Sequence, residues 1–144
     1  MKIDELPLVY ACSGCSSVAQ LANDCAVRLD REQKAQMSCI SGVGGGVSSL
    51  VKLAQSGRAI LALDGCALAC AKACLQQAGV EPGVHLVLNQ QGARKRFHVD
   101  ATETEAQQVW QTIEMALQQL NAKTQTIDFD DGYYRLIATT NVNT

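Results

Sequence analysis

The stretch AILALDGC, residues 59–66, joins a continuous apolar run to an Asp-Gly-Cys turn. Five apolar residues without alternation are typical of a central strand in a parallel sheet, because such a strand is covered on both faces. The residues at 7–11, 35–41 and 84–89 also have the composition of short buried strands. We therefore expect four parallel strands, with a fifth, short edge strand at 96–99.

Helical periodicity separates these strands. Apolar residues spaced three and four apart predict helices between them and after the last one, at 18–29, 47–57, 66–79 and 101–121. Thr102 and Glu105 have the spacing of a capping box at the start of the last of these helices. The glycines between residues 42 and 46 predict a loop.

Strands and helices alternate along the chain, which is the order expected of a parallel sheet with helices on its faces. The sequence thus predicts a small doubly wound, three-layer α/β fold with a mainly parallel sheet of four to five strands. Residues 1–144 have the length of a single domain. The tail at 126–144 breaks the pattern, and we expect it to be partly strand or disordered.

Charge and hydropathy exclude several classes of protein. Twelve basic and fourteen acidic residues give a net charge of −2, whereas nucleic-acid binding requires clustered basic residues. The one basic run, Arg94 to Arg96, is typical of a solvated turn. No apolar run is long enough to span a membrane. The run at 7–11 is too short for a signal peptide and follows two acidic residues. We expect a cytoplasmic protein.

Seven cysteines crowd into the first half of the chain. Their odd number argues against a secreted disulfide framework and favours a reducing compartment. Cys12 and Cys15 follow the first strand, Cys39 ends the second, and Cys66 follows the third. Because parallel strands end at one edge of the sheet, where ligands of such folds bind, we expect these thiols to lie close together.

The spacing of the remaining cysteines separates candidate ligands from packing residues. Cys66 and Cys70 are four residues apart, so they would be neighbours on a helix. A helix start at Cys66 would also favour a thiolate, the form that binds metal. Cys74 lies two turns beyond Cys66 and faces the expected core, and Cys25 falls on the apolar face of the first helix. We interpret these last two as core residues.

Four stretches around the cysteines resemble the DGC-domain family, described as zinc-binding proteins of bacteria and archaea. They are YACSGCSSVAQLA, KAQMSCISGVGGG, LALDGCALACAKACLQQAG and HLVLNQQGARKR, within residues 9–96. The resemblance implies one zinc ion held by four cysteines, Cys12, Cys39, Cys66 and Cys70. Cys15 departs from the family pattern and is a candidate to replace or supplement Cys12. Four thiolates would give a closed site, suited to a structural, sensing or metal-delivery role.

Two other chemistries remain open for the same cysteines. Cys12 with Cys15, or Cys66 with Cys70, could form a dithiol that cycles with a disulfide or handles a thiophilic substrate. An iron–sulfur cluster is the third hypothesis. No residue is placed clearly enough to be assigned a catalytic role, so the sequence does not decide whether the protein is an enzyme.

Several residues near the cysteines have structural interpretations. We expect His85, at the start of its strand, to lie at the opposite edge from the thiols, and His98 to be a surface residue. Asp64 is interpreted as a helix cap, with support of a metal ligand as the alternative. Trp110 and the tyrosines of the tail are either dimer contacts or core residues, which makes a homodimer a candidate state.

Overall fold

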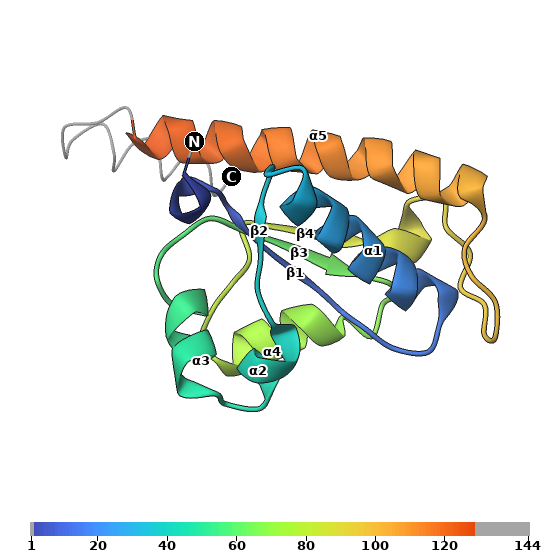
Figure 1. Ribbon diagram of the computed structural model, residues 1–144, viewed down its shortest axis with the longest axis horizontal. Coiled ribbons are helices and arrows are strands. Elements are labelled where there is room, and N and C mark those ends of the chain that lie inside the picture. The colour runs from blue at the N-terminus through green and yellow to red at the C-terminus, as the bar shows by residue number, and fades with distance from the viewer. Residues whose placement is uncertain (1, 129–144) are drawn as a thin grey trace.

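The computed structural model describes residues 2–128 (Figure 1). Along the chain the elements are η1 (Ile3–Glu5), β1 (Leu8–Ala11), α1 (Ser17–Arg31), β2 (Gln36–Met37), α2 (Ile40–Gly44), α3 (Ser48–Ala54), β3 (Ile60–Asp64), α4 (Cys70–Gln77), β4 (Val84–Val87), η2 (Leu88–Gln90) and α5 (Glu103–Asp128). This order confirms the predicted α/β fold.

The four strands form one parallel sheet in the order β2-β1-β3-β4. The chain moves from β1 outward to β2 and then crosses to β3 on the other side of β1. The direction of winding therefore reverses between β1 and β3, the place where ligands bind in open α/β sheets. The expected fifth strand at 96–99 is wrong for the described chain, where Phe97 makes one isolated bridge with Ser16.

Helices cover both faces of the sheet (Figure 1). Val9 and Ala11 of β1 point into a core with α1 and α5. Leu8 and Tyr10 point into a second core that contains side chains of α2, α3 and α4. β3 alternates in the same way, so each central strand is buried on both faces.

The helices around the carboxyl edge of the sheet differ from the prediction. α4 begins at Cys70 and not at Cys66, because residues 65–69 form a turn in which Ala69 has a positive φ of 53°. β2 is only two residues long, so Cys39 is the residue before α2 and not a strand end. Each of these corrections moves a candidate thiol relative to its helix.

The loop predicted at the glycine cluster is largely the short helix α2. A Cβ atom at Gly42 would overlap the side chain of Leu50, and one at Gly44 would lie 2.9 Å from the Cys74 sulfur. Glycine therefore lets α2 pack closely on α3 and α4. Packing overrides the low helix propensity of glycine here.

The last helix is longer than predicted and reaches residue 128, so the first part of the expected tail is helical. The rest of that tail, 129–144, lies outside the described residues. Trp110 of α5 is 7% exposed and belongs to the core, with the Arg28 guanidinium 3.8 Å from its ring centroid. None of the helices in the described range is long and apolar enough to cross a membrane.

Candidate thiol site

Cys12 and Cys66 flank the point where the winding of the sheet reverses. β1 and β3 are adjacent, and each strand is followed closely by one of these cysteines. The Cys12 N–H donates to the Leu63 carbonyl at 3.0 Å, and the Gly65 N–H donates to the Cys12 sulfur at 3.1 Å. The turn after β3 is thus joined directly to the thiol that follows β1.

A glycine is needed at position 65 because the turn after β3 lies directly against α1. A Cβ atom there would lie 2.6 Å from the Val18 carbonyl carbon and 2.7 Å from the Ala19 nitrogen. Both atoms are backbone of α1, so they cannot rotate away. The glycine of the Asp-Gly-Cys turn is therefore required for the turn to rest on the first helix.

Asp64 holds the start of α4. Its side chain is 1% exposed and accepts hydrogen bonds from the Ala71 N–H at 2.8 Å and the Lys72 N–H at 3.1 Å. This confirms the capping role expected of Asp64, although the cap acts from the end of β3, six residues before the helix. Asp64 thereby positions Cys70, the first residue of α4.

His85 is the third partner of this carboxylate. Its Nε2 lies 2.8 Å from an Asp64 oxygen, as expected for a tautomer that donates. The expectation that His85 lies at the edge opposite the thiols is therefore wrong: its imidazole reaches along the sheet to the residue that precedes the Gly65 turn. His98 is exposed, as expected of a surface residue.

Three of the candidate thiols interact electrostatically. Burial is the main cause that raises the pKa of Cys12 to about 11. The charges of Asp64, Cys70 and Cys66 raise it as well, while the Gly65 hydrogen bond lowers it. Cys12 is half-buried and Cys70 is exposed. We refer to Cys12, Cys66 and Cys70, which lie in or directly after the turns that follow β1 and β3, as the thiol cluster.

The other cysteines have separate surroundings. Cys39 is the residue before α2 and interacts electrostatically with Tyr10. Cys15 is exposed in the turn before α1. Cys25 is 5% exposed and belongs to the core beside α1, as predicted. Cys74 is half-buried and packs against Gly44 between α4 and α2, outside both cores.

Lys95 is the residue that sequence reasoning missed. Its Nζ lies 3.4 Å from the Cys66 sulfur, whereas the sequence indicated only a solvated basic turn. An ammonium group at this distance attracts a thiolate more strongly than a neutral donor does. The signal was present in the basic run, but nothing in the local pattern tied that run to Cys66.

Zinc suits the chemistry of the donors at this edge, since thiolates are preferred zinc ligands. The side chains are not gathered around a common centre, however. Within residues 2–128, no three His, Cys, Asp or Glu side chains are grouped closely enough to hold a metal ion. Zinc binding would therefore require rotation of thiol side chains, for which the exposed Cys39 and Cys70 have room.

Comparison with known proteins identifies the family. The DGC domain matches residues 8–113, which extends the similarity beyond 9–96 into α5. The chain belongs to the DGC-domain family. It is also 56% identical to the anaerobic and virulence modulator AnvM of Pseudomonas aeruginosa, over 79% of this chain and 87% of that protein. No solved structure matches the chain.

Proposed function

We propose that this DGC-domain protein is a regulatory protein that binds a zinc ion through cysteine thiolates at the carboxyl edge of its sheet. The thiol cluster carries the proposal, because Cys12 and Cys66 follow the two strand ends that flank the reversal of winding, and Cys70 begins the helix after the second of them. Half-buried Cys12, whose pKa is raised to about 11, keeps its proton at neutral pH as a free thiol. A bound metal ion would replace that proton and compensate the charge.

The fourth donor is proposed to be Cys39. It is exposed at the same edge, and the residue before the short helix α2 can reorient without unfolding a long element. Cys15 is the competing candidate, because it is exposed in the turn that follows Cys12. Variants of these two cysteines therefore distinguish the two sites.

A regulatory role is supported by the relative named an anaerobic and virulence modulator. A site of four thiolates would leave no open position for a substrate, which suits sensing or delivery of metal better than catalysis. Free thiols persist in reducing compartments, so we propose that the protein acts in the cytoplasm.

Metal analysis of the purified protein tests the proposal. The full chain is purified without chelator under reducing conditions, reconstituted with zinc and analysed for bound metal. We expect one equivalent of zinc, and cobalt substitution should give the intense absorption of thiolate ligation. Zinc well below one equivalent after reconstitution would overturn the proposal, and bound iron with visible absorbance would favour a cluster instead.

Single cysteine variants locate the site. Cys12→Ser, Cys66→Ser and Cys70→Ser should each lower zinc affinity at least about tenfold, because each removes a ligand. Cys74→Ala is the matched control: it lies one turn beyond Cys70 and packs against Gly44. Equal losses in Cys39→Ser and Cys74→Ala would remove Cys39 from the site and direct attention to Cys15.

A dithiol function is the second candidate, favoured by the half-buried Cys66 beside Lys95 and by the exposed Cys70 beyond the same turn. Thiol titration with and without a zinc chelator separates the two functions. Ligands of a metal ion should react only after chelation, whereas a redox dithiol should react at once and be lost on mild oxidation.

A further inference from the structure

The contact between Lys95 and Cys66 joins residues 29 positions apart in the sequence. The Lys95 ammonium also lies 5.4 Å from the centroid of the exposed Phe97 ring. Lysine side chains usually extend into water because of their rotamer entropy. A lysine held partly buried against a sulfur therefore needs a surrounding structure that restrains it.

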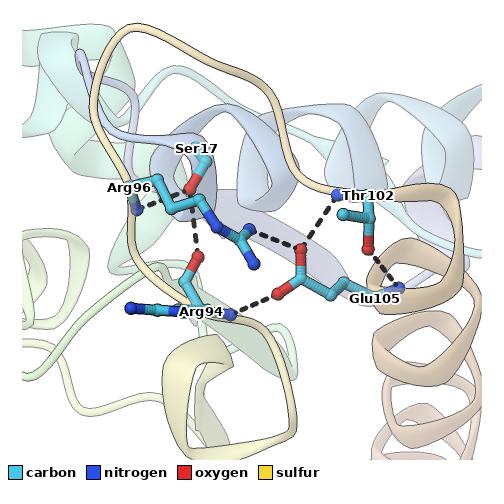
Figure 2. Close-up of polar contacts among 5 residues, drawn as sticks. All are labelled: Ser17, Arg94, Arg96, Thr102 and Glu105. Carbon is cyan, nitrogen blue, oxygen red and sulfur yellow. Dashed lines mark hydrogen bonds and ion pairs between the residues drawn. The ribbon is translucent and has the colours of Figure 1, made fainter.

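Ser17, in the first turn of α1, supplies one half of that restraint (Figure 2). The Ser17 N–H donates to the Arg96 carbonyl at 2.8 Å, and the Arg96 N–H donates to the Ser17 hydroxyl oxygen at 2.9 Å. The hydroxyl in turn donates to the Arg94 carbonyl at 3.1 Å. Ser17 thus holds the backbone on both sides of Lys95.

Glu105 of α5 supplies the other half (Figure 2). One carboxylate oxygen accepts the Arg94 N–H at 2.6 Å, and the other accepts Nη1 of Arg96 at 2.8 Å. The guanidinium of Arg96 is the largest cause that lowers the pKa of Glu105 to about 2, followed by the backbone N–H groups of Arg94 and Thr102. Glu105 is therefore charged at neutral pH.

The same carboxylate belongs to the capping box of α5. The Thr102 N–H donates to Glu105 at 2.9 Å, and the Glu105 N–H donates to the Thr102 hydroxyl at 3.1 Å. This confirms the capping box expected from the sequence. We call residues 94–96 with Ser17 and Glu105 the strap, because they fasten the start of α1 to the start of α5.

We propose that Lys95 is a positioning residue of the thiol site, which the strap holds so that its positive charge stays against the Cys66 sulfur. The site then favours anionic over neutral thiol-reactive ligands at Cys66. This inference rests on the proposed function only in treating Cys66 as a thiol of the site, and it holds for the metal-free protein.

The charge of the alkylating reagent tests the inference. Reduced, metal-free full-length protein is treated with anionic iodoacetate or neutral iodoacetamide at one pH, and labelling of Cys66 is followed by peptide mass spectrometry. Both reagents attack the thiolate, so the ratio of their rates cancels the ionised fraction. A positive charge near the sulfur should raise the iodoacetate-to-iodoacetamide ratio about threefold, and added salt should reduce it.

Substitutions test whether the Lys95 charge causes the raised ratio. Lys95→Met should lower the ratio about threefold, whereas Lys95→Arg should retain it. Arg94→Met is the matched control, because it removes the same charge from the neighbouring position of the strap and only the Arg94 backbone takes part in the strap. Glu105→Gln should lower the ratio by a smaller factor, since it loosens the strap and leaves Lys95 intact.

Two results would overturn the inference: an unchanged ratio in Lys95→Met, or an equal fall in Arg94→Met. Should Lys95→Met fail to fold, a ratio in the wild-type protein that does not respond to salt would overturn it as well. Zinc content is measured on the same preparations. If the protein binds no zinc but the iodoacetate-to-iodoacetamide ratio still depends on Lys95, the proposed function is refuted and this inference stands.

Discussion

Two turns at the carboxyl edge of the sheet present cysteines in different ways. After β1, residues 12–16 lead into α1, and Ser16 caps that helix by accepting the Ala19 N–H at 3.1 Å. After β3, residues 65–69 lead into α4, which is capped from a distance by buried Asp64. The helix after the first turn is capped locally, whereas the geometry of the second turn depends on the sheet, on α1 and on His85.

Cys15 and Cys66 differ in exposure accordingly. Cys15 lies in the locally capped turn and is exposed, while Cys66 lies in the turn that is packed onto other elements and is half-buried. Substitutions in the second turn should therefore cost more stability and move more thiols than equivalent substitutions in the first.

The largest difference is expected between glycines of the two turns. Gly65→Ala would force a Cβ atom against the backbone of Val18 and Ala19 and should destabilise the protein by about 3 kcal/mol. Gly14→Ala has space, with Ala19 Cβ as its nearest neighbour at 3.8 Å, and should change stability by less than about 0.5 kcal/mol. Urea denaturation measures both. Similar losses would show that the turns are equally constrained.

The helix caps should give the next largest difference. Asp64→Asn replaces one carboxylate oxygen, an acceptor, by an NH₂ group that faces the donors of Ala71, Lys72 and His85. We expect the free energy of unfolding to fall by about 2 kcal/mol. Ser16→Ala removes one local cap and should cost about 1 kcal/mol. The rate at which Cys70 is alkylated should rise only in Asp64→Asn. An equal response in Ser16→Ala would mean that Cys70 is not positioned by Asp64.

Thiol reactivity sharpens the same comparison. In metal-free protein at pH 8, Cys15 should be alkylated at least about tenfold faster than Cys12, because Cys15 is exposed and burial raises the Cys12 pKa to about 11. Time-resolved peptide mapping with iodoacetamide measures both rates in one sample. Faster labelling of Cys12 would indicate that the burial of this thiol is not maintained in solution.

The smallest effect is expected for the strap, which fastens the start of α1 to the start of α5. The pKa of Glu105 is lowered in the folded protein, so its contribution is present above the unfolded value near 4.3 and is lost as pH falls toward 2. Glu105→Gln should cost about 1 kcal/mol at pH 7 and little at pH 2. Urea midpoints across this range, with exposed Glu103→Gln as control, measure it; a loss independent of pH would contradict the assignment.

The order of elements and the position of Cys12 could be predicted because strand and helix periodicity are local signals. The apolar run of β3 and the Asp-Gly-Cys turn likewise placed Cys66 at the correct edge of the sheet. The start of α4 could not be predicted in this way. Its cap comes from Asp64, six residues earlier, and the turn between them depends on contacts with α1 that no local pattern records.

The remaining differences have the same tertiary origin. Gly42 and Gly44 lower helix propensity, yet close packing against Leu50 and Cys74 makes a helix favourable there. The Lys95–Cys66 contact depends on the strap, whose partners come from α1 and α5. Sequence periodicity predicts the helices and strands. The geometry of the thiol site, however, depends on contacts between the ends of those elements, which periodicity does not record.

The stacking of Arg28 on Trp110 has a practical consequence for following this molecule in solution. Trp110 is the single tryptophan of the chain, so all tryptophan fluorescence reports on the packing of α5 against the last turn of α1. Cys12 and the Gly65 turn lie against the start of α1, at the opposite end of that helix. The protein thus carries an optical probe of its fold that is spatially separate from these parts of the thiol cluster.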